Sequence, residues 1–388
     1  MLINPKMRRH HYLCALFLAA CLFAAGGCDF QHSSNKPQPQ STPAASPNSN
    51  VTPKTVDASY DFTGVDRILE RAAPQLGGCA LVLIQDDKVI YRKSFGRFGT
   101  DKVVPVASAS KWLSGALIMT LVDEGKLSLD DKVSKYIPEF HNDKSDITIR
   151  HLFAHTSGLP PEASCRNDKR TTLERCASEM ARLKLRAPPG EEFFYGGVSM
   201  HIGGRIAEIV SGKSFNELFV ERLATPLGME RTDFFAYGPT GNPRPAGDAR
   251  SSADDYGRFL QMILQQGTFA GKPILSAASV RELHKDQTGG ARIAYTIYEK
   301  HAARDPELPM ARYGVGVWRE KVDRDSQQLR EASSQGALGF SPWIDVERQL
   351  AGVLSTQSSF SRVMPVYLEL KNEIRRIIPA TNNSLELQ

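Results

Sequence analysis

The sequence lacks several patterns that commonly identify a function. It contains no His-Glu-x-x-His or paired Cys-x-x-Cys motif, so we expect no catalytic metal. It also contains no phosphate-binding glycine loop, and we expect no cofactor. No fixed-period repeat is present, which argues against solenoids and propellers. Because basic residues form no stripe interleaved with aromatic ones, we expect no nucleic-acid partner.

The chain has little excess charge once its first residues are set aside. Lys6, Arg8 and Arg9 lie in residues 1–27, which hold no acidic residue, and removing them lowers the formal net charge from +5 to +2. A net charge this close to zero gives no ground to expect nucleic-acid binding. With 388 residues, of which 41% are hydrophobic, the chain can bury a full core.

The N-terminus lacks an apolar run long enough for a permanent membrane span, which needs about 20 residues. Its apolar run covers residues 12–25, follows a basic segment and ends at Gly26-Gly27-Cys28. This order predicts an export signal over residues 1–27. The small residues before Cys28 resemble a bacterial lipoprotein signal, which implies that Cys28 is lipidated. The protein would then be held at the cell membrane, facing the periplasm or the exterior. A conventional secreted protein is the alternative.

Three cysteines remain beyond the leader and the predicted lipidation site: Cys79, Cys165 and Cys176. Export permits a disulfide. Cys165 and Cys176 lie close together in a polar segment, whereas Cys79 begins an apolar run. We therefore favour a Cys165–Cys176 disulfide, with two free thiols as the alternative.

Composition divides the rest of the chain. Residues 31–57 are rich in Ser, Pro, Gln and Asn and hold hardly any large apolar residue. Such a segment cannot repay the entropy of ordering, so we predict a disordered tether over residues 28–57. We assign residues 58–380 to one folded domain and residues 381–388 to a tail.

Strand patterns lie at both ends of the predicted domain. Residues 79–84 and 88–95 are β-rich runs on either side of a polar turn and should form a hairpin. Further β-rich runs near the C-terminus cover residues 313–318, 339–344 and 349–355. Helical spacing occurs at residues 65–72 and 366–378 and through much of the middle. We predict an α+β fold in which helices flank one antiparallel sheet and a mostly helical subdomain is inserted.

The segment Ser108-Ala109-Ser110-Lys111 precedes apolar residues at helical spacing up to Gly125. If Ser108 opens a helix, Lys111 lies on the same face, and the helix N-terminus favours developing negative charge. A desolvated lysine has a lowered pKa and can help to remove the serine proton. A helix N-cap with a solvated lysine fits Ser-x-x-Lys equally well in isolation. The apolar stripe beside Lys111 favours the catalytic interpretation.

The sequence resembles the serine β-lactamase and penicillin-binding-protein superfamily, particularly its class C and family VIII esterase-like branch. The resemblance covers about residues 62–378 and rests on Ser108 and Lys111 together with four further segments. These segments are residues 121–131, 149–160, 226–229 and 252–255. The resemblance implies a β-lactamase/transpeptidase-like fold and an ester intermediate on Ser108.

The family's second motif, Tyr-x-Asn, is similar to Tyr195-Gly196-Gly197. The resemblance implies that Tyr195 acts as base toward Ser108 and later as acid toward the leaving group, with Lys111 lowering its proton affinity. Gly197 stands where the family has asparagine, which removes an amide that would hold substrate and lysine. Without the resemblance, Tyr195 would be interpreted as a packed core residue.

The family's third motif, Lys-Thr-Gly, is similar to Ser334-Gln335-Gly336, which has no cation. In the family that lysine helps to bind the carboxylate of β-lactams or peptidoglycan stems, so its absence disfavours those substrates. The resemblance implies an oxyanion hole formed by the backbone N–H groups of Ser108 and Ala337. It also implies substrate contacts by Gly197, Ser334, Gln335 and Gly336.

Histidines offer an alternative triad with Ser157 or Ser199 as nucleophile. The candidates are His151, His155 and His201. Residues 197–201 lack the closing glycine and the preceding buried strand of a nucleophile elbow, so we do not favour this triad. We expect His155 to form structural hydrogen bonds in a loop near the site.

Together these features predict an esterase-like serine hydrolase of the cell envelope. Its substrate would be a small ester, amide or peptide. One alternative is a D,D-peptidase, carboxypeptidase or class C β-lactamase, which would be favoured if another cation reached the site in three dimensions. A second alternative is a non-catalytic envelope binding protein on the same fold. The sequence carries no signal for an oligomeric state.

Overall fold

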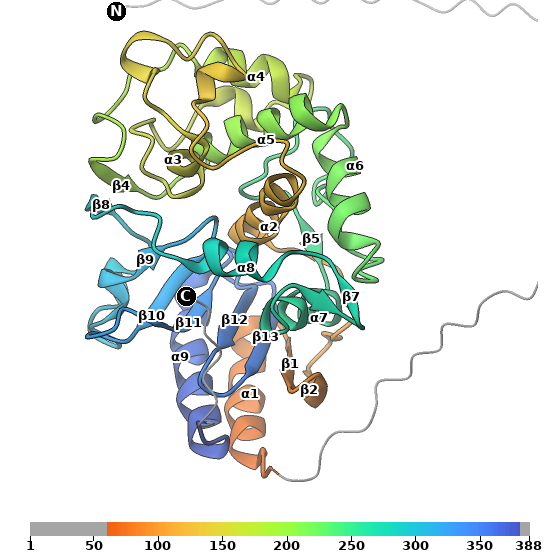
Figure 1. Cartoon of the computed structure of the whole chain (residues 1–388). Coiled ribbons are helices and arrows are strands. Elements are labelled where there is room, and N and C mark those ends of the chain that lie inside the picture. The colour runs from red at the N-terminus through yellow and green to blue at the C-terminus, as the bar shows by residue number, and fades with distance from the viewer. Residues whose placement is uncertain (1–59, 381–388) are drawn as a thin grey trace, which may run out of the picture. The chain divides into compact units, whose positions relative to one another are not determined.

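The computed structural model of the chain describes residues 60–380 (Figure 1). The predicted export signal, Cys28, the tether and the tail lie outside the described residues. Within the described part, seven strands form an antiparallel sheet in the order β2-β1-β13-β12-β11-β10-β9. Their bounds are β1 Cys79–Gln85, β2 Lys88–Phe95, β9 Arg312–Tyr313, β10 Trp318–Val322, β11 Leu329–Ser333, β12 Ser341–Asp345 and β13 Leu350–Thr356. The sheet therefore joins the two ends of the domain, because β1 pairs directly with β13.

Both faces of the sheet are buried, which explains the nearly continuous apolar sequence of β1. Ala80, Val82 and Ile84 belong to one hydrophobic core, and the alternating Cys79, Leu81 and Leu83 belong to the other. Successive side chains of a strand point to opposite faces, so a strand between two cores has no polar side.

Helices α1 (Thr63–Leu76) and α9 (Phe360–Ile377) lie side by side on one face of the sheet (Figure 1). The helical spacing of residues 65–72 places Val65, Ile68, Leu69 and Ala72 in the buried stripe of α1. Gly77 ends this helix with φ of 72°, a left-handed conformation that glycine adopts without strain.

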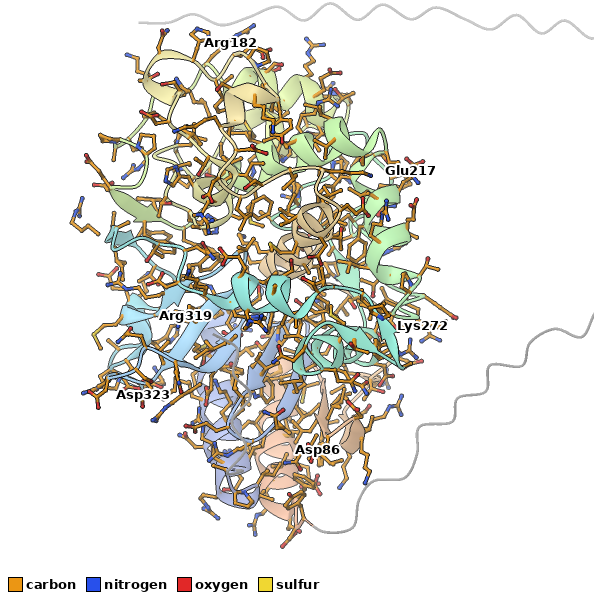
Figure 2. The ribbon with its side chains drawn as sticks, in the orientation of Figure 1. Asp86, Arg182, Glu217, Lys272, Arg319 and Asp323 are labelled. Atoms are coloured by element: carbon orange, nitrogen blue, oxygen red, sulfur yellow. A yellow bond between two sulfur atoms is a disulfide. The ribbon has the colours of Figure 1, made fainter. Side chains whose placement is uncertain are left out.

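The other face of the sheet is covered by α7 (Ala253–Leu264), with α2 (Ser110–Asp123) and α8 (Ala277–His284) beyond it. A helical part follows α2 in the chain and comprises α3 (Ile149–Phe153), α4 (Leu173–Met180), α5 (Val198–Ser211) and α6 (Phe215–Phe219). Figure 2 shows Arg182, which follows α4, far from Asp86 in the β1–β2 turn. Short strands pair as β3 (Val104–Pro105) with β5 (Arg250–Ser251), β4 (Glu192–Phe194) with β8 (Arg292–Tyr295) and β6 (Thr268–Phe269) with β7 (Lys272–Pro273).

The predicted α+β fold is confirmed, including the first hairpin, but three element predictions need correction. Residues 313–318 are not one strand, because Gly314 N–H bonds Val317 O at 2.8 Å and closes a tight turn before β10. That turn packs against the backbone of α2, and a Cβ on Gly316 would lie 2.3 Å from Lys111 O. Strand β11 was not predicted, and α9 begins six residues before residue 366.

A buried ion network ties α9 to the sheet. Lys371 on α9 is 3% exposed and pairs with Glu320 of β10 at 2.5 Å and with Glu331 of β11. Tyr367 donates a hydrogen bond to Glu320 at 2.9 Å, and Arg375 completes the pairing of Glu331. Burial alone would raise the pKa of Glu331, but Lys371 and Arg375 hold it well below its ordinary value.

We predict that Lys371→Met lowers the free energy of unfolding by about 3–5 kcal/mol, because two buried carboxylates lose their central cation. Equilibrium urea unfolding measures this loss. Arg71→Ala is the matched control: its pair with Glu369 also links α1 to α9, but both side chains are at least half exposed. Removing an exposed pair should cost at most about 1 kcal/mol. Equal costs for the two variants would contradict the assignment.

Candidate active site

Ser108 lies in a turn that presents it at the start of α2. The turn is a 3₁₀ segment, Ala107–Ala109, and α2 begins at Ser110, so Ser108 precedes the helix rather than opening it. Ala107 has φ of 48°, a left-handed conformation that is uncommon for residues other than glycine. The turn is braced by Ser110 Oγ, which donates to Ala107 O at 2.6 Å, and by Tyr256 OH, which donates to Ala109 O at 2.8 Å. Ser108 remains partly exposed.

The Lys111 amine lies 3.2 Å from Ser108 Oγ and 3.0 Å from Ala246 O. The side chain is 3% exposed, and burial is the main cause that lowers the pKa of Lys111 to about 7. The positive charges of Arg166 and Arg244 act in the same direction, and Glu162 opposes them. A large fraction of Lys111 is therefore a free amine at neutral pH, which can accept a proton.

Tyr195 follows β4 and completes a cluster with Ser108 and Lys111. Lys111 Nζ lies 4.6 Å from the centroid of the Tyr195 ring, which stacks on Trp318 at 5.1 Å. Burial raises the pKa of Tyr195, and the nearby side chains of Ser108 and Trp318 only partly offset this effect. The phenol therefore keeps its proton at neutral pH. Lys111 is not among the causes of this shift, so the expectation that it lowers the proton affinity of Tyr195 stays a prediction.

His155 packs beside Tyr195 through ring contacts rather than through hydrogen bonds. Its ring lies 4.8 Å from the rings of both Tyr195 and Tyr313. Neither ring nitrogen has a hydrogen-bond partner within the described residues. Burial, with a smaller contribution from Lys111, lowers the pKa of His155 well below its ordinary value. The ring therefore forms none of the expected hydrogen bonds within the described residues, although His155 O accepts one from Phe194 N at 2.9 Å. The neutral ring helps to seat Tyr195.

The other histidines and serines do not form the alternative triad. Ser157 Oγ and Ser199 Oγ bond each other at 2.8 Å. His201 Nε2 bonds Asn242 Oδ1 at 2.8 Å, and His151 Nδ1 accepts from Thr148 N at 3.3 Å in the capping box of α3. Each of these side chains has a structural partner.

The third motif braces the nucleophile turn from the end of β11. Ser334 Oγ donates to Ser108 O at 3.1 Å, and Gly336 N–H bonds Phe340 O at 2.8 Å. Ser334 and Gln335 are 1% and 2% exposed, and Gln335 has no amide partner within residues 60–380. All three residues of the motif are buried, and the expected substrate contacts of Ser334, Gln335 and Gly336 stay a prediction. Ala337 is exposed and its N–H stays a candidate for the oxyanion hole.

Gly197 is covered by Arg166, a residue that the sequence did not reveal. Gly197 is buried, and its N–H donates to Pro161 O at 3.0 Å. A Cβ on Gly197 would lie 2.0 Å from Nη2 of Arg166, so the guanidinium fills the space that a side chain would need. The expected contact between Gly197 and substrate stays a prediction, with Arg166 as the side chain beside it. In the sequence, only the missing side chain at position 197 pointed to the presence of another residue in this space.

Cys165 and Cys176 form a disulfide with their Cα atoms 5.4 Å apart, the pairing favoured from the sequence. Cys79 is a buried free thiol, and burial raises its pKa to about 12, which makes it unreactive.

Within residues 60–380, no group of His, Cys, Asp or Glu side chains is arranged to hold a metal. No described helix is both long enough and apolar enough to span a membrane.

A sheet between two helical layers, with an inserted helical part, defines the β-lactamase/transpeptidase class of fold. The chain belongs to the Beta-lactamase family, whose model matches residues 65–370. It is 34% identical to a Bacteroides dorei protein assigned as a β-lactamase, with a TM-score of 0.74, over 82% of this chain and 99% of that one. The predicted family is thereby confirmed, and the family is one of hydrolases.

Other similarities are more distant. A family VIII carboxylesterase has a TM-score of 0.63 at 18% identity, over 81% of this chain and 97% of that one, and shows the fold alone. The Staphylococcus aureus (strain MW2) protein flp is 29% identical over 187 residues, which are 44% of this chain. The chain spans 38% of the length of that curated relative.

We predict that Lys111 titrates near pH 7, well below the ordinary lysine value of about 10.4. Lysine side-chain ¹³C chemical shifts, followed against pH by NMR, measure this. Arg166→Gln should raise the pKa of Lys111 by removing a positive charge, and Glu162→Gln should lower it. Shifts in the same direction for the two variants would contradict the electrostatic account.

Proposed function

We propose that this protein is a serine hydrolase that transfers an acyl group from an ester or amide substrate to Ser108 and then to water. The observation that carries the proposal is the Lys111 amine, 3.2 Å from Ser108 Oγ and with a pKa lowered to about 7. An unprotonated amine within hydrogen-bond distance of a serine hydroxyl is the arrangement that activates such a nucleophile.

The lowered pKa of Lys111 and the raised pKa of Tyr195 support the following order of proton transfers. Ser108 Oγ attacks the substrate carbonyl carbon while its proton passes to Lys111 Nζ. The tetrahedral intermediate then collapses to an ester on Ser108, and the leaving group departs with a proton from Tyr195 OH, which Lys111 replaces. Water attacks the ester, its proton passes to Lys111, and Ser108 recovers a proton as the carboxylic acid leaves.

Developing negative charge on the carbonyl oxygen needs donors that are already in place. We assign this role to the backbone N–H groups of Ser108 and Ala337, the first partly exposed and the second exposed. Ser334 supports the assignment, because its bond to Ser108 O ties the nucleophile turn to the segment that carries Ala337.

Within this proposal, we favour esters over amides as the substrates. Ser334-Gln335-Gly336 supplies no cation, so the third motif cannot make the carboxylate contact that helps to bind a β-lactam or a peptidoglycan stem in the family. The likeness in fold to a family VIII carboxylesterase and to EstCE1, a hydrolase with promiscuous acyltransferase activity, agrees with this choice.

One observation favours a second candidate, a peptidase or β-lactamase. Arg166 lies close enough to Lys111 to lower its pKa, so a cation does reach the site from another element. Binding of a labelled penicillin to Ser108 would support this candidate over the esterase.

We also propose that the enzyme acts in the cell envelope, held there by lipid on Cys28. The basic segment, the apolar residues 12–25 and the small residues before Cys28 support this proposal.

We predict that a fluorophosphonate probe labels the protein and that Ser108→Ala abolishes labelling. Tyr195→Phe should slow ester hydrolysis by about 10²- to 10⁴-fold, the usual contribution of a general acid or base. Ser199→Ala is the control, and labelling should persist in it. Labelling that survives in Ser108→Ala would refute the nucleophile. No labelling of the unmodified protein would favour the non-catalytic alternative.

For the anchor, we predict that the full chain fractionates with membranes and that Cys28→Ser releases it into the soluble fraction or blocks processing of the leader. Metabolic labelling with a palmitate analogue measures lipidation directly, and Cys79→Ser is the matched control, which should keep its label. An equal label on the Cys28→Ser chain would contradict the proposal.

A further inference from the structure

A buried guanidinium occupies the second-motif region beside the Ser108–Lys111–Tyr195 cluster. Arg166 is 8% exposed, and its Nη2 lies in the space that a side chain at position 197 would fill. Gly197 is two residues from Tyr195, and Arg166 is near enough to Lys111 to shift its pKa. The charge therefore belongs to the active site, although it comes from a different segment.

The segment that carries Arg166 is fixed from three directions. Its neighbour Cys165 is joined to α4 by the disulfide. Asn242 donates to Cys165 O at 2.9 Å, and Arg244 donates to Asn167 Oδ1 at 2.8 Å. A charged group held this firmly loses little entropy when it binds a ligand.

The guanidinium has donors left over. Within the described residues, both hydrogen bonds of Arg166 come from Nη1, one to Glu162 and one to Pro161 O at 3.5 Å. Nε is buried and has no acceptor there. Because Nε is buried, the Nη2 arm of the guanidinium fork, which donates no hydrogen bond within residues 60–380, is the donor left for a carboxylate oxygen.

Glu162 does not neutralise Arg166 as a buried partner would. Its side chain is 71% exposed, so water screens its attraction and the carboxylate can move away at little cost. A substrate carboxylate could therefore share the guanidinium with Glu162 or replace it. Arg244, the other cation near Lys111, is already paired with Asp248.

We propose that Arg166 is a specificity-determining residue that binds a carboxylate on the ester substrate through Nη2. This inference rests on the proposed function and adds a substrate class to it: esters that carry a negative charge near the scissile bond. The cation that the third motif lacks is supplied from the second-motif side.

The test compares two pairs of esters with the full chain. Mono-p-nitrophenyl glutarate and p-nitrophenyl pentanoate differ by a carboxylate on the acyl part. 4-Acetoxybenzoate and phenyl acetate differ by a carboxylate on the leaving group. The measured quantity is the ratio of kcat/KM for the charged ester to that for the neutral one, because a change in the pKa of Lys111 affects both members of a pair alike.

Arg166→Gln should lower this ratio about 10- to 100-fold in at least one pair, mainly through KM, as expected for the loss of a charge-assisted hydrogen-bonded pair. The affected pair shows which part of the substrate carries the carboxylate. Arg166→Lys should restore the ratio only in part, because lysine has no fork. Glu162→Gln, at an exposed position, should raise the ratio by removing a competing carboxylate.

Ratios unchanged by Arg166→Gln in both pairs, with hydrolysis still dependent on Ser108, would overturn the inference and leave the proposed function intact. If Arg166→Gln does not fold, as judged by thermal unfolding, a Glu162→Gln ratio equal to that of the unmodified protein overturns it instead. Absence of any Ser108-dependent hydrolysis would refute the proposed function and this inference together.

Discussion

The burial of one amine beside one hydroxyl is the constraint on which the rest of the site depends. Lys111 is placed in a protein interior that disfavours its charge, and among the described residues its Nζ hydrogen-bonds only to Ser108 Oγ and Ala246 O. The free energy that keeps this amine desolvated comes from the surrounding fold. The packing of α2 between the sheet and the helical part therefore sets the reactivity of Ser108 as well as its position.

Segments far apart in the chain must converge to maintain that burial. The nucleophile turn is held by Ser334 after β11 and by Tyr256 on α7. The turn at Gly316 approaches so closely that no side chain fits against Lys111 O. Because β1 pairs with β13, the sheet that positions these residues closes only when both ends of the domain are in place. The site is thus a property of the complete domain.

The sequence could predict what depends on local spacing. Ser108 and Lys111 are three residues apart, so their proximity follows from helix geometry, and the pairing of β1 with β2 follows from two apolar runs and a polar turn. Tyr195 could be identified only through the family resemblance. Strands β10 and β11 were obscured because they carry Glu320 and Glu331, whose buried charges are paired by Lys371 on α9. A strand whose apolar pattern is interrupted by charged residues can be recognised only when the distant residue that pairs with those charges is known.

Arg166 could not be predicted for a related reason: its contact with Gly197 joins segments 31 positions apart through packing and a disulfide. In the sequence, two departures from the family motifs have no evident connection: the absence of a side chain at Gly197 and the absence of a cation at Ser334-Gln335-Gly336. In three dimensions they are connected, since the space opened at Gly197 admits a guanidinium. An amide in that position would offer substrate a neutral hydrogen bond, whereas a guanidinium offers a charge and also disfavours protonation of Lys111. If Ser108 is the nucleophile and Arg166 binds substrate as proposed, one replacement links the choice of substrate to the activation of the nucleophile.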